Sequence, residues 1–96
     1  DSTKEEMTAK ETALLAAKKR AITVPLEVAR LSHQVLELAV DLVNRGNPNS
    51  VSDVGVAGEV AYAGVRGGSL NVYINLPAVD SDQKFIVEVK KDVELL

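Results

Sequence analysis

The sequence contains no cysteine and no tryptophan, and it has a single histidine. The missing cysteines exclude disulfides, thiol nucleophiles and thiolate metal ligands. One histidine argues against a zinc site with the usual protein ligands, so we expect no metal. Aromatic residues are scarce as well, being limited to Tyr62, Tyr73 and Phe85. The apolar residues are therefore mainly Ala, Val and Leu, which suit close helix packing better than a β-sandwich.

Long apolar runs and charge of one sign are also missing. No run approaches the roughly 18 apolar residues of a membrane span, and the polar start Asp1-Ser2-Thr3-Lys4 is no secretory signal. The net charge is −3, with basic and acidic residues interspersed, so neither nucleic acid nor an anionic membrane is a favoured partner. We expect a soluble cytoplasmic protein.

The chain has 96 residues, which fit at most one domain with a marginal core of its own. We therefore expect help from a partner. The first residue is Asp1 rather than Met, which suits a piece of a longer protein.

Apolar or small residues recur at helical spacing from Thr3 to about Arg45. The pattern keeps its phase through Pro25, which predicts one long helix bent at that residue. A proline inside a helix costs about 3 kcal/mol or more, which packing must offset. Two separate helices remain an alternative, because the β-branched stretch Ile22-Thr23-Val24 before the proline resists helical geometry. The residues of this apolar seam are Met7, Leu14, Ala17, Ala21, Val24, Val28, Leu31, Val35, Leu38 and Leu42.

The segment after this helix carries stop and start signals. Arg45-Gly46 ends the helix with a cation and a glycine, and Asn47-Pro48-Asn49-Ser50 predicts a turn. Ser50 and Asp53 have the spacing of a capping box, with Ser52 as a competing cap, so a second helix begins here.

The course of the second helix is ambiguous in sequence. Leu70–Leu76 alternates like a strand, and five glycines between Gly55 and Gly68 weaken a helix. Helical periodicity nevertheless places one set of small and polar residues on a single face, and we choose helix on that ground. These residues are Asp53, Ala57, Ala61, Gly64, Gly68, Asn71 and Asn75. Pro77 ends the segment, and Asp80-Ser81-Asp82 predicts a short final helix.

The face with these residues has two interpretations. A tightly packed helix pair would explain its small residues, and a ligand cleft would explain its polar ends. Asn71 and Asn75 are four residues apart and can share one pocket. Asp53 and Asn71 are separated by roughly 27 Å along a straight helix, so a second, antiparallel subunit would have to bring Asp53 to the asparagines.

Three blocks of the sequence resemble the formimidoyltetrahydrofolate cyclodeaminase family, which includes methenyltetrahydrofolate cyclohydrolases. They are Ala21-Ile22-Thr23-Val24-Pro25-Leu26, the block from Gly46 to Ala57, and Leu70-Asn71-Val72-Tyr73-Ile74-Asn75-Leu76. The resemblance covers about Ala13 to Phe85. It assigns residues 1–96 to the C-terminal half of the helical cyclodeaminase or cyclohydrolase domain, whose N-terminal half is absent here.

The resemblance implies an all-α, up-and-down helical bundle that forms a homodimer. It also implies a tetrahydrofolate derivative as substrate and no tightly bound cofactor. The reaction would be cyclodeamination of 5-formimidoyltetrahydrofolate to 5,10-methenyltetrahydrofolate with release of ammonia, or hydrolysis of the methenyl compound to 10-formyltetrahydrofolate. The alternative function is a non-catalytic dimerisation module that keeps only the packing face.

Within this family, the candidate roles fall on the second helix and the turn before it. Asp53 would transfer protons, Asn71 and Asn75 would orient the folate, and Asn47, Asn49 and Ser52 would shape the loop. Each has a simpler explanation as well. Asp53 suits the positive end of a helix dipole, and Asn47 and Asn49 are ordinary turn residues.

Overall fold

The computed structural model describes residues 3–46 and 51–96 of the chain, and these residues form helices without any strand. The all-α class expected from the sequence is confirmed. None of the described helices combines the length and the apolar character that a membrane span requires. The elements are α1 (Lys4–Arg45), α2 (Val51–Asn75), the short 3-10 helix η2 (Leu76–Val79) and α3 (Gln83–Glu94).

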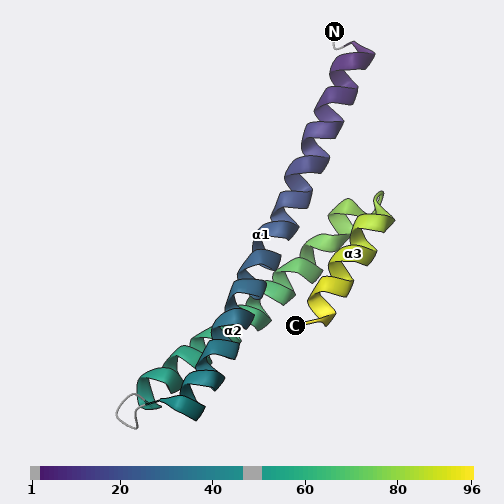
Figure 1. The fold of residues 1–96 in the computed structure, drawn as a ribbon. Coiled ribbons are helices and arrows are strands. Elements are labelled where there is room, and N and C mark those ends of the chain that lie inside the picture. Colours follow the sequence, from purple (N-terminus) through teal and green to yellow (C-terminus); the bar gives the residue numbers. More distant parts are fainter. Residues whose placement is uncertain (1–2, 47–50) are drawn as a thin grey trace.

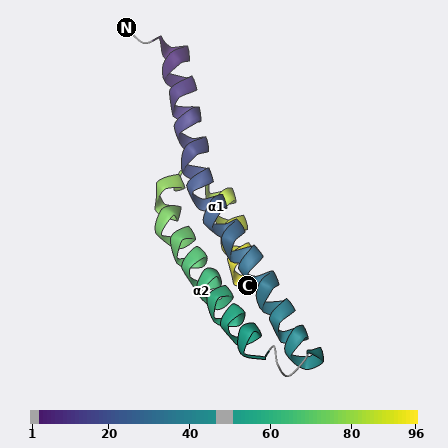
Figure 2. The same ribbon diagram turned by 90° about the vertical axis from the view of Figure 1, so that its left-hand side faces the viewer.

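Helices α1 and α2 form an antiparallel hairpin, and α3 lies along one side of it (Figures 1 and 2). The N-terminal part of α1 extends beyond the rest of the molecule in both views. The molecule measures 68 × 23 × 17 Å, and its radius of gyration is 18.6 Å. A compact domain of this length has a radius of gyration of about 13 Å. The chain is therefore elongated and exposes much surface for its size.

Helix α1 is a single helix, as its periodicity predicts. Thr3 and Glu6 form a capping box at its start, with the Glu6 backbone N–H 3.1 Å from Thr3 Oγ1. The helix continues through Pro25 and stops at Gly46, which adopts an extended conformation with φ −79° and ψ 163°. A Cβ atom at Gly46 would collide with the Leu42 carbonyl oxygen, so glycine is required there by close approach.

Helix α2 includes the segment whose local sequence favours a strand. It runs through Leu70 to Asn75, and Val72 and Leu76 are buried against the rest of the molecule. Helical spacing brings these two side chains to the same side, where they reach the core. Tertiary packing thus overrides the local strand preference. Pro77 lies in the first turn of η2, where its missing N–H is tolerated.

Helix α3 begins where the acidic cap predicts. Asp82 accepts a hydrogen bond of 3.1 Å from the Phe85 backbone N–H. The same carboxylate lies 2.6 Å from Lys19 Nζ, and this ammonium lies 5.1 Å from the centre of the Phe85 ring. Nearer the end of α3, Asp92 lies 2.6 Å from Arg30. These two links orient α3 parallel to α1.

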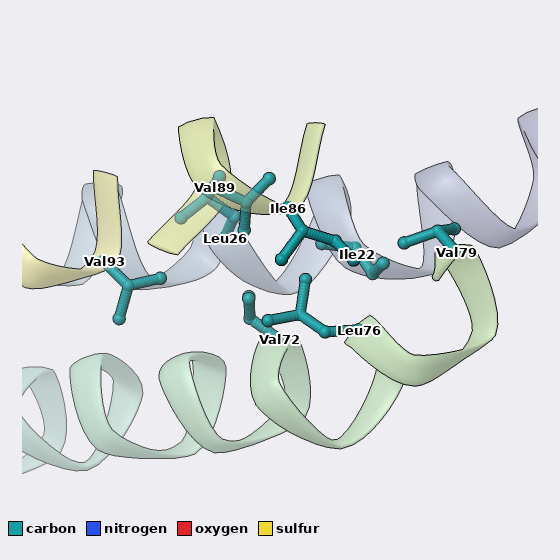
Figure 3. Close-up of a cluster of buried hydrophobic side chains, with 8 residues drawn as sticks. All are labelled: Ile22, Leu26, Val72, Leu76, Val79, Ile86, Val89 and Val93. Atoms are coloured by element: carbon teal, nitrogen blue, oxygen red, sulfur yellow. The ribbon is translucent and has the colours of Figure 1, made fainter. Parts of the chain in front are cut away.

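The main hydrophobic core lies between α3 and one side of the hairpin. Figure 3 shows its side chains pointing toward one another from all the elements. Ile22, Val72 and Val79 are completely buried. The full cluster consists of Ile22, Leu26, Val72, Leu76, Val79, Ile86, Val89 and Val93.

The apolar seam found in the sequence of α1 is not the surface that packs on α2 and α3. All ten of its residues are exposed. The buried residues of α1 are Ile22, Leu26, Ala29 and Ala39, which also recur at helical spacing. Three of them, Ile22, Ala29 and Ala39, directly follow a seam residue. Helix α1 therefore has two apolar sides. The hairpin covers one of them and leaves the other exposed.

The exposed side forms part of a surface that we call the open face, which is the side of the hairpin opposite α3. Val24 and Val28 are each two residues from a core residue, so they lie on nearly the opposite side of α1 from the core. Helix α2 carries a matching set of exposed or half-buried residues. The open face consists of Ala21, Val24, Val28, Leu31, Val35, Leu38 and Leu42 of α1 and Asp53, Val56, Val60, Ala63, Gly67, Leu70 and Ile74 of α2.

The two long helices approach most closely at small residues. A Cβ atom on Gly68 would lie 2.6 Å from the Pro25 carbonyl oxygen and 3.0 Å from Ala29 Cβ. A Cβ atom on Gly64 would collide with the Ser32 side chain. The small residues in the middle of the α2 face therefore allow the helices to pack, as the helix-pair interpretation expects.

We predict that Gly68→Ala destabilises the protein by about 1–3 kcal/mol, because the new methyl group meets backbone atoms that cannot move aside cheaply. Gly67→Ala is the matched control, since a Cβ atom at Gly67 has no neighbour within 4 Å. It should stabilise the helix by roughly 0.5–1 kcal/mol. Urea unfolding of both variants measures the difference, and equal effects would contradict the close approach.

A second prediction concerns Asp82. The hydrogen bond from Lys19 and then that from the Phe85 backbone hold the pKa of Asp82 below its ordinary value of 3.8. Because the folded pKa is depressed, this stabilisation is present above pH 3.8 and is lost as the pH falls through the folded pKa. Asp82→Asn keeps a capping side chain and removes the charge.

Wild type should therefore resist urea better than Asp82→Asn near neutral pH, and the two should converge in acid. Urea midpoints measured from neutral pH down to about pH 2 test this. If the urea midpoints of wild type and Asp82→Asn differed by the same amount over that whole range, the ion pair would not be the cause of the difference.

Candidate functional site

A groove of about 550 Å³ lies on the open face where α1 and α2 cross. One wall belongs to α1 on both sides of Pro25, and the other belongs to the C-terminal half of α2. The lining is apolar apart from two asparagine amides and exposed backbone, and it carries no charged side chain. Its residues are Ala21, Val24, Pro25, Val28, Gly64, Gly67, Gly68, Asn71 and Asn75.

Asn71 and Asn75 lie together in this groove, as their spacing predicts. Asn75 Nδ2 donates a hydrogen bond of 2.8 Å to the Asn71 backbone carbonyl. That bond fixes the Asn75 amide and leaves its side-chain oxygen as an acceptor. Asn71 is exposed and Asn75 is half-buried. The pair can thus offer both donors and acceptors to a ligand in the groove.

Pro25 adds a backbone acceptor to the same place. In a regular helix, residue 25 would donate its N–H to the carbonyl of Ala21. Proline has no N–H, so this carbonyl loses its usual helical donor. Both residues line the groove. A carbonyl without its usual helical donor, next to two amides, is suited to accept a hydrogen bond from an N–H group of a planar heterocycle.

Asp53 lies at the other end of α2. It is exposed in the first turn, and Ser52 beside it is exposed too. The neighbouring Val54 lies with Val40 and Val43 near the end of α1, which fixes the level of Asp53 on the hairpin. The eighteen residues between Asp53 and Asn71 separate them by roughly 27 Å in this continuous helix. The structure therefore does not bring Asp53 to the groove within one copy of the chain.

Asp53 does share the side of α2 on which the groove opens. Residues seven apart lie on nearly the same side of a helix, and this relation connects Asp53 with Val60, Gly67 and Ile74. Asp53 and the asparagines thus lie on one continuous surface, at opposite ends. Asn47 and Asn49, which the sequence proposes as loop-shaping residues, lie outside the described residues.

The groove also contains residues that the sequence does not single out as a site. Pro25 is interpreted there as a bend, and Gly67 is not part of the selected α2 face. The signal that could have identified Pro25 is its place in Ala21–Leu26, the first of the three blocks that resemble the family. In residues 3–46 and 51–96, no three acidic or histidine side chains come together in a way that could hold a metal ion.

Comparison with known proteins identifies the family. The family model described as formiminotransferase-cyclodeaminase matches residues 1–95, and the chain belongs to this family. The resemblance seen in the sequence blocks is thereby confirmed. No solved structure gives a significant match to the chain.

Two kinds of curated relative are similar to the chain. Methenyltetrahydrofolate cyclohydrolase of Methylorubrum extorquens is 41% identical over 93 residues, covering 97% of this chain and 44% of the relative. The formimidoyltransferase-cyclodeaminases of mouse and rat are each 33% identical over 81 residues, covering 84% of this chain and 15% of each relative. The chain thus spans less than half the length of the curated relatives it matches.

Proposed function

We propose that this chain supplies part of a folate site in an enzyme of one-carbon metabolism. The reaction is either loss of ammonia from 5-formimidoyltetrahydrofolate or hydrolysis of 5,10-methenyltetrahydrofolate. The names of the relatives support both, since one is a cyclohydrolase and the others are cyclodeaminases. The higher identity and coverage are those of the cyclohydrolase. We propose a cytoplasmic location for the reaction.

The groove at Asn71 and Asn75 is the observation that carries this proposal. Its volume of about 550 Å³ falls within the range of small-molecule sites, roughly 300–1,000 Å³. The backbone at Gly67 and Gly68 forms a wall without side chains, against which a flat pterin ring can lie. The amides and the Ala21 carbonyl then match the alternating donors and acceptors of the ring edge.

Both reactions require proton transfer near the one-carbon unit between N5 and N10. In the deamination, N10 attacks the formimidoyl carbon and loses a proton, while the departing amine gains one. In the hydrolysis, water adds to the methenyl carbon and loses both its protons as the formyl group forms, and N5 gains one proton as the N5–carbon bond breaks. A carboxylate suits either transfer, and Asp53 is our candidate. Ser52, Asn47 and Asn49 would shape the surface beside it.

Because Asp53 lies far from the asparagines within one copy, we propose that the working form is a homodimer. The missing length relative to the curated relatives also leaves room for an N-terminal half, in the same chain or in a partner, to complete the site. We propose no tightly bound cofactor, with the tetrahydrofolate derivative as substrate.

We predict that Asn71→Ala weakens binding of tetrahydrofolate by roughly 3-fold to 10-fold, as expected for the loss of one hydrogen bond. Asn44→Ala is the control, because Asn44 is exposed on α1 outside the groove. Isothermal titration calorimetry measures both. Absence of any binding heat in wild type would favour the non-catalytic dimerisation module.

We also predict that Asp53→Asn lowers kcat about 10²-fold to 10⁴-fold, the usual contribution of a general acid or base. Asp53 is exposed, so the fold should be preserved, and circular dichroism checks this. Steady-state assays with both folate substrates give kcat and KM. Near-normal turnover in a folded variant would remove Asp53 from the catalytic role.

A further inference from the structure

A second hollow, which we call the notch, lies between the N-terminal half of α1 and the turn from η2 to α3. Its volume is about 370 Å³. Helix α1 continues past this turn toward the N-terminus (Figure 1). Two leucines of α1 give the notch an apolar wall, and polar groups surround it. The residues that matter for its chemistry are Glu11, Thr12, Lys18, Ala78 and Ser81.

The notch directly follows the groove along both walls of the hairpin. On α1, Lys18 precedes Ala21 of the groove by three residues and Pro25 by seven, which places it on their side of the helix. On the other wall, Ala78 of the notch follows Asn75 of the groove by three residues. The groove and the notch are therefore neighbouring hollows on one side of the hairpin.

Lys18 lies in the notch without an opposing charge. It is half-buried, and in residues 3–46 and 51–96 no carboxylate lies within ion-pair distance of its ammonium group. Its neighbour Lys19 is instead paired with Asp82 at 2.6 Å. Arg20 is two residues further on, so it lies on nearly the opposite side of α1. Partial burial of an unpaired cation costs free energy, and an anionic ligand would reduce that cost.

We propose that the notch binds the glutamate tail of the folate whose pterin ring occupies the groove, with Lys18 paired to a tail carboxylate. This inference rests on the proposed function and specifies how the charged part of the substrate is recognised. The Ser81 hydroxyl is a second donor for the same carboxylate. The Thr12 hydroxyl has a different role, since it donates to the Thr8 backbone carbonyl at 2.9 Å.

The spacing of the two hollows matches the shape of a folate. A methylene group, N10, a benzene ring and an amide separate the pterin from the glutamate, a distance of roughly 10 Å with ordinary bond lengths. The two helical turns between Pro25 and Lys18 correspond to roughly 11 Å along α1. A ligand whose ring lies beside Pro25 therefore carries its carboxylates to the level of Lys18.

The charges favour this end of the groove over the other end. The N-terminal half of α2, beyond the other end, has only Asp53 and Glu59 as charged residues within Val51–Gly64, and both would repel a carboxylate. Glu11 also lines the notch, but it is exposed and seven residues from Lys18. Those two turns separate their backbones by roughly 11 Å, and solvent screens the repulsion at that distance.

Calorimetric titration of the full chain with two ligands tests the proposal. One ligand is tetrahydrofolate, and the other is its diamide, in which both tail carboxylates are replaced by neutral amides of nearly the same shape. Lys18→Met should weaken binding of tetrahydrofolate about 5-fold to 20-fold and leave binding of the diamide unchanged, because only the first ligand presents a charge to Lys18. Lys18→Arg should keep most of the affinity, since it preserves the charge.

Arg20→Met is the matched control. It removes the same charge two residues away, at a position that lines neither the notch nor the groove. This variant should bind both ligands as wild type does. If Arg20→Met and Lys18→Met weakened tetrahydrofolate binding equally, a diffuse field and not the notch would hold the tail, and the proposal would be overturned.

The two proposals fail in different ways. If wild type binds neither ligand, the proposed folate function is wrong and the tail site falls with it. If wild type binds tetrahydrofolate and the diamide equally well, the folate function stands and the notch is not the tail site. The same conclusion follows if Lys18→Met weakens both ligands by one factor, since that result assigns Lys18 a purely structural role.

Discussion

The close approach of α1 and α2 at Gly68 is the constraint on which the rest of the structure depends. The Pro25 carbonyl and Ala29 lie where a larger side chain would be, so the two helices can cross only at glycine. This contact fixes which residues of the two helices are neighbours. It brings Asn71 and Asn75 to the level of Pro25, where the interrupted helical hydrogen bonding leaves a backbone acceptor. The same contact places Asp53 at the level of the C-terminal end of α1.

Helix α3 determines which side of the hairpin remains exposed. Its apolar residues complete the core on one side only, and the links from Lys19 to Asp82 and from Arg30 to Asp92 hold it there. Both ion pairs are partly exposed to solvent, so they contribute more to the direction of α3 than to stability. The groove opens on the side that α3 leaves uncovered. The core and the proposed site thus use opposite sides of the same two helices.

The helices themselves could be predicted from sequence, because periodicity over many residues outweighs local preference. Leu70–Leu76 shows this: its alternation favours a strand, yet Val72 and Leu76 reach the core only from a helix. The neighbourhood of Asn71 and Asn75, and the distance of Asp53 from them, follow from helix geometry alone. Which of the two apolar sides of α1 packs on α2 and α3 could not be predicted, since both follow helical spacing. Ion pairs such as Lys19 with Asp82, 63 residues apart, leave no signal in a single sequence.

The most direct test of the central claim, that the Pro25–Asn71–Asn75 groove binds the folate, is a crystal structure of the protein grown with a tetrahydrofolate derivative. We expect the pterin ring to lie against Gly67 and Gly68, with the amides of Asn71 and Asn75 within hydrogen-bond distance of its edge. A folate bound elsewhere, with this groove filled by side chains of another segment, would contradict it.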